Sequence, residues 1–324
     1  MWRNKTHSYS HSVDVFFFRK KNLHIPGSGT FEDLKKNCII RDFHLHCFRS
    51  LSFVPIVYSG DLEAIERLAY EFCEDSKRCN VIYSEVRYSP HKLKSMYSEP
   101  IPYLCLCSGL LDVTSQVVKG LKRGERDFGV KCKSILSGCS WLPHSIPDIL
   151  KVCENFTNDV VGIDLLSLAQ GNGKSDLFLC RGQKRGYGTT IHAGEVSVEL
   201  YQSHRVGHGY HVVQDEKFYK ECLRNRVHFE CCPWSSFLTA ANIFFFAVCR
   251  LADDGANFSI NSDDTTLTGY PLDSDYSLVS SWGVTEKQLE QTNLNAARSC
   301  FLPEDEKKDL IKRLMEKLST GGSL

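Results

Sequence analysis

Polar side chains of the kinds that bind metals and carry protons cluster at three places in the second half of the chain. The three groups are His192-Ala193-Gly194-Glu195, Gly207-His208-Gly209-Tyr210-His211 and Ser262-Asp263-Asp264. Imidazole and carboxylate groups suit zinc that keeps an open position for water. A carboxylate three residues beyond a ligand can carry a proton beside a metal-bound water. One histidine at the end of a strand is usually structural, but three such groups in succession predict a metal site.

The elements that must position these groups are short apolar runs, rich in β-branched residues and separated by helical stretches. Near-continuous apolarity suits strands that are buried on both faces of a parallel sheet. Strands that alternate with helices indicate repeated βα units. The seven runs are Val81–Tyr88, Val130–Leu136, Val160–Leu166, Thr189–Ala193, Arg205–Tyr210, Val227–Cys232 and Asn257–Asn261.

The closed arrangement of βα units has eight strands, and one strand is not found. We therefore predict an α/β fold of the (β/α)8 TIM-barrel type, incomplete at its first strand. The carboxyl ends of all strands converge on one face of such a barrel, so the three polar groups would meet in space. We expect residues 1–324 to form a single domain, with residues 1–20 as a poorly ordered or non-homologous tail.

Helical periodicity predicts two packing helices. The first covers Asp61–Asp75, and the second begins after Pro303, where acidic residues suit the start of a helix. The glycine-containing stretch Gly171–Gly188 is interpreted as a long loop with room for a short helix. The residues expected on the buried helix faces are Leu62, Ile65, Leu68, Ala69 and Phe72 in the first, and Leu310, Ile311, Leu314, Met315 and Leu318 in the second.

Composition and charge narrow the class of protein. The chain has 39 Lys and Arg against 39 Asp and Glu, so no basic field exists to hold a nucleic acid. No apolar run is long enough to span a bilayer, and Val13–Phe18 is too short for a signal-peptide core. The fifteen cysteines are scattered without a Cys-x-x-Cys pair, which indicates buried reduced thiols rather than a zinc knuckle. These features predict a cytoplasmic protein.

The three polar groups resemble the C-terminal signatures of the adenosine deaminase family. Four further strings are similar to that family as well, and together they extend from about residue 60 to the end of the chain. They are Glu85-Val86-Arg87-Tyr88-Ser89-Pro90-His91, Gly124-Glu125-Arg126-Asp127-Phe128-Gly129, Cys232-Pro233-Trp234-Ser235-Ser236 and Phe301-Leu302-Pro303-Glu304-Asp305-Glu306-Lys307. The resemblance is closer to the small purine-nucleoside enzymes than to AMP deaminases.

The resemblance implies zinc-dependent hydrolysis of adenosine or 2′-deoxyadenosine to the inosine product, with one zinc ion per chain. His192 and Asp263 would bind the zinc, which lowers the pKa of its water. Glu195 would protonate N1 of the purine, and His208 would orient or deprotonate the water. Asp264 would hold N7. The implied partner is therefore a small purine nucleoside.

The family's two further zinc ligands come from a His-x-His on the first strand. This chain has His44-Leu45-His46, but Cys47-Phe48-Arg49 follows, and no apolar strand precedes it. Its distance to the Glu85–Pro90 string fits the family's lid helix, which Asp42, Phe43, Leu45 and Phe48 resemble. His7 and His11 lie in the N-terminal tail. Whether His44 and His46 or another N-terminal histidine completes the site stays open.

Other departures from the family keep a second interpretation open. Leu166-Ser167-Leu168-Ala169 stands where the family has Ala-Gly-Asp-Glu, and a side chain there would intrude where glycine lets backbone approach the substrate. Only twelve residues separate Glu195 from His208, too few for a full helix and turn. The stretch Ile243–Phe246 is apolar where relatives are polar. The alternative is an impaired deaminase-like binding or regulatory protein, or an incomplete gene product.

Overall fold

A computed structural model describes residues 60–94, 106–140, 145–166, 173–193, 203–238 and 244–319. Contacts between residues divide the chain into two compact units. The first holds the described residues of 60–84, 90–132 and 264–269, and the second holds those of 85–89, 133–263 and 270–324.

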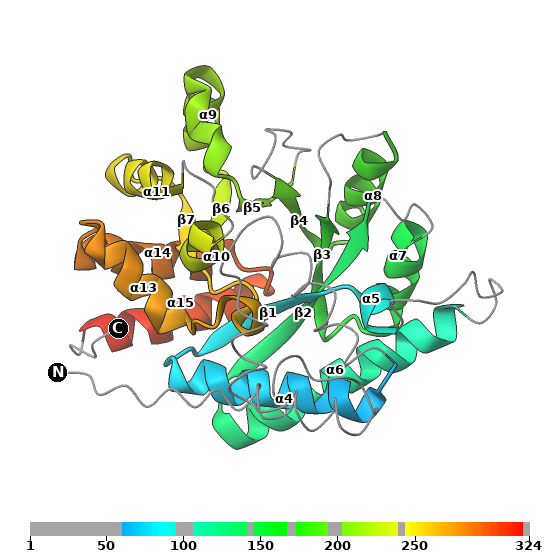
Figure 1. The fold of residues 1–324 in the computed structure, drawn as a ribbon. Coiled ribbons are helices and arrows are strands. Elements are labelled where there is room, and N and C mark those ends of the chain that lie inside the picture. The colour runs from blue at the N-terminus through cyan, green and yellow to red at the C-terminus, as the bar shows by residue number, and fades with distance from the viewer. Residues whose placement is uncertain are drawn as a thin grey trace, which may run out of the picture. The chain divides into compact units, whose positions relative to one another are not determined.

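Seven strands form one sheet in the order of the chain (Figure 1). From the second strand to the seventh, every neighbouring pair is parallel. This βα alternation confirms the predicted (β/α)8-type fold, short of one strand. The described ranges hold no eighth strand, and residues 1–59, where the first strand is expected, lie outside them. The strands are β1 Tyr83–Tyr88, β2 Lys131–Cys139, β3 Val160–Leu166, β4 Gly188–Ala193, β5 Arg205–His208, β6 His228–Cys231 and β7 Phe258–Ile260.

Helices connect most of the strands, and both predicted packing helices are present. The stretch interpreted as a long loop with room for a short helix holds an eleven-residue helix, α8, so the helix is present and the loop is shorter than expected. The helices are α4 Leu62–Arg78, α5 Pro90–Lys94, α6 Leu106–Phe128, α7 Ser145–Asn155, α8 Gly173–Gln183, the 3-10 helix η2 Tyr210–Gln214, α9 Glu216–Arg224, α10 Pro233–Leu238, α11 Phe244–Asp253, α12 Thr265–Thr268, α13 Leu272–Ser281, α14 Glu286–Ser299 and α15 Glu304–Ser319.

Two residues assigned to buried helix faces are exposed. Leu62 is 39% exposed and Met315 is 54% exposed. Leu62 is the first residue of α4, where Asp61 accepts the backbone N–H of Ala64 as N-cap. Met315 lies in the C-terminal part of α15, whose one fully buried residue is Leu310. Helical periodicity places a residue on a face, but burial also requires a neighbouring element along that part of the helix.

The first unit is built on close packing of α4 against α6. Glycines on α6 permit this approach, because a Cβ on Gly120 would lie 2.2 Å from the Glu66 carbonyl oxygen, and one on Gly124 would lie 2.4 Å from Cβ of Cys73. The Glu66 carboxylate also accepts from Lys119 Nζ and Arg123 Nη1, each at 2.7 Å. Both cations are well exposed, so apolar packing contributes more to stability than these ion pairs.

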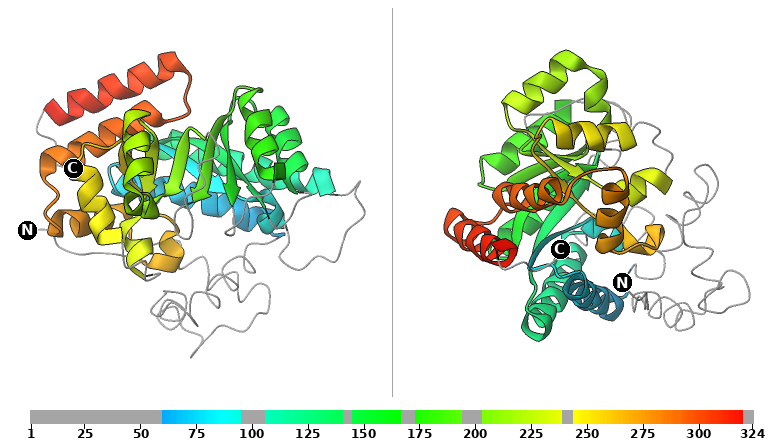
Figure 2. Two further views of the ribbon diagram at one scale, coloured as in Figure 1. Left: turned by 90° about the horizontal axis from the view of Figure 1, so that it is seen from above. Right: turned by 90° about the vertical axis from the view of Figure 1, so that its left-hand side faces the viewer.

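In the second unit, Phe301 lies against the beginnings of β3 and β4. A Cβ would lie 2.6 Å from its ring at Gly162 and 2.1 Å from it at Gly188, so glycine in these strands makes room for the ring. The Arg205 guanidinium also lies over the Phe301 ring, 3.6 Å from the ring centroid. Phe301 thereby joins the segment between α14 and α15 to three strands. Figure 2 shows α14 and α15 side by side.

A buried carboxyl group joins α13 to α10. The Asp275 side chain is fully buried, and its Oδ1 accepts the Trp234 backbone N–H at 2.8 Å, while Oδ2 has no hydrogen-bond partner. Burial is the main reason that the pKa of Asp275 is raised from 3.8 to about 7, and the nearby Asp263 and Asp273 carboxylates add to it. The fold therefore favours the neutral form of this group.

This raised pKa predicts a pH-dependent effect of Asp275→Asn on stability. The contribution of the neutral Asp275 is complete below pH 3.8, where the unfolded chain is also protonated, and it is lost as the pH rises toward about 7. An amide cannot ionise. The free energy of unfolding of the variant, relative to that of the wild type, should therefore rise by about 1–3 kcal/mol between pH 5 and pH 8. Urea unfolding at both pH values measures this difference. The exposed Asp309→Asn on α15 is the control, because Asp309 does not act on the pKa of Asp275. An Asp275→Asn effect that is independent of pH would contradict the assignment.

Candidate metal centre

His192 lies near the end of β4, opposite Leu166 of β3 and Gly207 of β5. Its Nδ1 lies 3.1 Å and 3.0 Å from the two carboxylate oxygens of Asp164 on β3. Asp164 is fully buried and also accepts the Ser137 hydroxyl at 2.9 Å. The Asp164 carboxylate, which Ser137 holds in place, therefore fixes the orientation of the His192 imidazole.

The charge of Asp164 decides which nitrogen of His192 is available. Burial alone would raise the pKa of Asp164, but His192 and Arg87 outweigh burial, and the pKa is lowered. An ionised carboxylate only accepts hydrogen bonds, so Nδ1 of His192 carries a hydrogen, and in the neutral imidazole Nε2 then keeps its lone pair. Burial likewise acts to lower the pKa of His192, and the Asp164 charge raises it overall. A histidine whose Nδ1 is bonded to a carboxylate is the arrangement found in zinc sites.

His208 is the last residue of β5 and has a left-handed backbone, with φ at 61°. Residues other than glycine rarely adopt this backbone conformation, and those that do are concentrated at functional sites. The next residue, Gly209, also has a positive φ of 73°, and a Cβ there would lie 2.5 Å from the Phe229 ring. The buried imidazole of His208 lies beside that of His192, with ring centroids 5.7 Å apart.

Asp263 follows β7 and also has a left-handed backbone, with φ at 56°. Its Oδ2 accepts the Ser235 hydroxyl at 2.7 Å and lies 3.9 Å from Nε2 of His208. Burial acts to raise the pKa of Asp263, but His208 and the Ser235 hydrogen bond outweigh it, so the pKa is lowered. Asp263 is therefore an ionised carboxylate beside two imidazoles.

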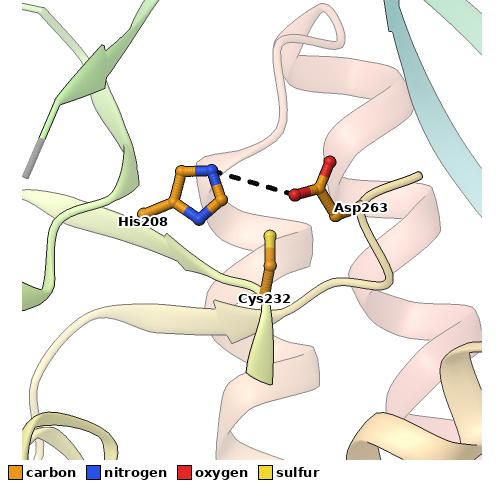
Figure 3. Close-up of side chains that lie close together, drawn as sticks. All are labelled: His208, Cys232 and Asp263. Atoms are coloured by element: carbon orange, nitrogen blue, oxygen red, sulfur yellow. Dashed lines mark ion pairs between the residues drawn. The ribbon is translucent and has the colours of Figure 1, made fainter. Parts of the chain in front are cut away.

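Three potential ligand atoms gather at this place. One atom each from His208, Cys232 and Asp263 lies within 4.8 Å of the others, and Figure 3 shows the three side chains directed toward a common space. Nitrogen, sulfur and carboxylate oxygen are the donor types that zinc accepts, so the residues fit this metal. His192 is outside this group of three, although its ring contacts His208.

Ion pairs between residues of β1, β3, β5 and β6 form a network inside the sheet. Arg87 of β1 forms an ion pair with Glu230 of β6, and its Nε lies 3.7 Å from Asp164. Arg205 of β5 pairs with the same Glu230 at 2.8 Å and with Glu85 of β1 at 2.5 Å. Burial would raise the pKa of Glu230, yet the two guanidinium groups lower it far below its usual range. Removing one member would leave an uncompensated buried charge, which costs several kcal/mol.

The structure places three of the five predicted site residues together: His192, His208 and Asp263. Asp264 follows Asp263 directly, is exposed, and its carbonyl accepts the Thr268 N–H at 2.9 Å. Glu195 lies in residues 194–202, outside the described ranges, and so do His44 and His46.

Sequence reasoning assigned no role to four residues that shape this site. A signal for three of them was available, because Arg87, Asp164 and Glu230 are charged residues inside apolar runs interpreted as buried strands. A buried charge needs a partner of opposite charge, so three such residues predict an internal ion network. Cys232 had only the weaker signal of standing at the end of a run interpreted as a strand, directly after the last residue of β6.

Comparisons with known proteins identify the family to which the sequence is similar. The family model for adenosine deaminase matches residues 31–317. A curated adenosine deaminase from Xenopus laevis is 40% identical over 95% of this chain and 92% of its own length, and one from Gallus gallus is 37% identical over 93% and 90%. A third, from Rattus norvegicus, is 39% identical over 93% and 91%.

Solved structures share the fold at lower sequence identity. Adenine deaminase from Arthrobacter aurescens is similar with a TM-score of 0.81 and 18% identity, covering 97% of both chains. A zinc-bound amidohydrolase from Burkholderia ambifaria has a TM-score of 0.76 and 20% identity, covering 97% of this chain and 91% of its own. The match of the family model over most of the length, together with relatives at 37–40% identity, shows that this chain belongs to the adenosine deaminase family.

Proposed function

We propose that this chain catalyses the hydrolytic deamination of adenosine and 2′-deoxyadenosine to inosine and 2′-deoxyinosine, in purine nucleoside metabolism. The observation that carries the proposal is the meeting of His192, His208 and Asp263 at the strand ends. Relatives named adenosine deaminase, which match over more than nine-tenths of the chain, support the choice of substrate.

The proposed cofactor is one zinc ion per chain, held by His192 and Asp263. When bound, zinc would supply Lewis acidity and lower the pKa of a water molecule. Asp164 prepares His192 for this role by holding Nδ1, and the Ser235 hydroxyl fixes one oxygen of Asp263. Both ligands are thus oriented by a hydrogen-bonded neighbour, as metal sites require.

The remaining predicted site residues would handle protons and substrate. His208 would take up or orient the proton of the attacking water, and its position beside Asp263 suits this. Glu195 would donate a proton to N1 of the purine, which makes C6 more electrophilic. Asp264 would hold N7.

We further propose that residues 1–324 act as one domain in the cytoplasm. The match of one family model over residues 31–317 supports a single functional domain. The cysteines that the structure describes are all free thiols, which suits a reducing compartment. In the described part of the chain, no helix is long and apolar enough to cross a membrane. The equal numbers of basic and acidic residues give no net positive charge that would attract nucleic acid.

One observation favours a second candidate, a binding or regulatory protein of impaired activity. Strand β4 ends at Ala193 and β5 begins at Arg205, although the two strands pair in parallel. The eleven residues between them are close to the shortest connection that parallel strands allow. Glu195 lies in this connection, so its placement decides between the two candidates.

The proton-donor assignment predicts that Glu195→Gln lowers turnover of adenosine by roughly 100-fold or more, because a glutamine side chain cannot donate a proton to N1. The fall in ultraviolet absorbance as adenosine becomes inosine measures turnover in zinc-supplemented protein. The exposed Glu221→Gln on α9 is the matched control and should keep wild-type turnover. Equal turnover in Glu195→Gln and wild type would exclude Glu195 as the proton donor.

The ligand assignment predicts that His192→Ala binds zinc at least about 10- to 100-fold more weakly, the loss that even an outer-sphere partner can cause. Competition with a zinc-binding dye measures this affinity without reference to activity. The control is His211→Ala, since His211 belongs to the same group of motifs but bonds to Gln214 at the surface. Unchanged zinc affinity in His192→Ala would remove His192 from the metal site.

A further inference from the structure

Two buried cysteines of the first unit lie in contact with each other, and the proposed deamination uses neither of them. The Sγ atoms of Cys73 on α4 and Cys132 on β2 are 3.6 Å apart. Both residues are buried, with Cys73 0% exposed and Cys132 7% exposed. They lie 59 positions apart in the sequence, so the fold, and not the local chain, brings the two thiols together.

We propose that Cys73 and Cys132 are a redox site, at which oxidation by a peroxide joins the two sulfurs in a disulfide between α4 and β2. A thiol reductant would open this disulfide again. Both cysteines are free thiols in the structure, which is therefore the reduced state of the pair. The proposal concerns residues away from the candidate metal centre and does not rest on the proposed function.

The packing around Cys73 confines its sulfur beside Cys132. Helix α6 packs against α4 (Figure 1), so closely that a Cβ on Gly124 would lie 2.6 Å from the Cys73 sulfur. The Leu121 carbonyl oxygen of the same helix lies 3.7 Å from that sulfur, and the Ala69 carbonyl oxygen of α4 lies 3.5 Å from it. The sulfur is therefore enclosed by two helices and the beginning of β2, in contact with the second thiol.

The distance between the sulfurs suits a disulfide after a small side-chain movement. A disulfide bond is about 2.05 Å long, so the two sulfurs must approach by roughly 1.5 Å. Sulfur is the terminal heavy atom of cysteine, and rotation about the Cα–Cβ bond moves it while the backbone stays in place. Cysteines whose side chains point apart would instead require backbone movement.

The hydrogen bond between the thiols determines which sulfur reacts first. With the S–H of Cys132 as donor, this bond lowers the pKa of Cys73, although burial acts in the opposite direction. The same bond, together with burial, raises the pKa of Cys132. Because the thiolate is the nucleophilic form of cysteine, we expect Cys73 to attack the oxidant.

The oxidation balances in two steps with hydrogen peroxide. The Cys73 thiolate attacks one peroxide oxygen, the O–O bond breaks, and the products are a sulfenic acid (S–OH) on Cys73 and hydroxide, which takes up a proton to become water. The Cys132 sulfur then attacks the sulfur of the S–OH group, the S–S bond forms, and hydroxide leaves and takes up the Cys132 proton. The two thiols lose two electrons, which reduce the peroxide to water. Because both sulfurs are buried, peroxide reaches them when α4 opens locally.

The disulfide would also stabilise the folded chain. It would close the chain over 59 positions, which restricts the unfolded state more than the folded state. For a loop of this length we expect the midpoint of thermal unfolding to rise by roughly 5 °C on oxidation.

The competing interpretation is that the two thiols only fill space between α4, α6 and β2. Buried thiols behave as small apolar groups and make contacts of this kind without any redox role. Peroxide would then oxidise other cysteines of the folded protein and leave Cys73 and Cys132 reduced. Since the chain has fifteen cysteines, the position of the disulfide, and not the loss of thiols, separates the two interpretations.

Peptide mapping of the folded full-length protein is the test, after treatment with a small excess of hydrogen peroxide and blocking of the remaining thiols. We expect a linked pair of peptides that contain Cys73 and Cys132, lighter by two hydrogen atoms than the separate peptides and absent after dithiothreitol. The matched control is Cys153→Ser on α7, which removes another buried cysteine and should keep the link. Protein unfolded in urea should give links scattered over many cysteines.

Two serine variants test the order of attack and the stabilisation. A reagent that traps sulfenic acids should label Cys73 in Cys132→Ser, and should label Cys132 in Cys73→Ser at least about 10-fold more slowly. Neither variant should gain thermal stability on oxidation, whereas the wild type should. Folded wild type in which other cysteines are oxidised and the Cys73–Cys132 link is absent would overturn the proposal, and this outcome does not depend on the folding of any variant. A link that leaves the midpoint of thermal unfolding unchanged would overturn the stabilising role.

Discussion

The pairing of charges buried within the sheet is the interaction on which the rest of the structure depends. Arg87 and Arg205 both pair with Glu230, and Arg205 also pairs with Glu85, so strands β1, β5 and β6 are joined inside the sheet. These buried charges are stable only as ion pairs, because an isolated buried ion costs several kcal/mol. The strands must therefore keep one register, and the residues at their ends keep their positions.

This network also positions the side chains of the candidate metal site. Arg87 approaches Asp164, Asp164 holds His192, and the His192 ring lies beside His208. Gly207 pairs with His192 across the sheet and precedes His208, and a Cβ there would lie 3.3 Å from Nη1 of Arg87, a tight contact that glycine avoids. The left-handed backbone of His208 and Asp263 shows where the fold accepts strain to aim a side chain. The same strand-end geometry that stabilises the sheet thus concentrates imidazole, thiol and carboxylate groups at one place.

Sequence patterns predicted the strands well, because strands that are buried on both faces consist of consecutive apolar residues, which are visible in the sequence. They also predicted His192, His208 and Asp263, which stand directly at the ends of such runs. They did not predict the partners of these residues, because the contacts of Asp164 with His192 and of Ser235 with Asp263 join positions 28 residues apart. The extent of helix α8 was underestimated because glycines stand at both of its ends. Leu62 was misplaced because periodicity does not say where a neighbouring element ends.

The proposed zinc ion would lie at these strand ends, between His192 and Asp263. Crystals of the zinc-loaded protein, measured on both sides of the zinc absorption edge, test this placement because the anomalous signal locates zinc itself. We expect a single peak in bonding contact with Nε2 of His192 and the carboxylate of Asp263. A peak elsewhere, or no peak in zinc-loaded crystals that show the folded sheet, would contradict it.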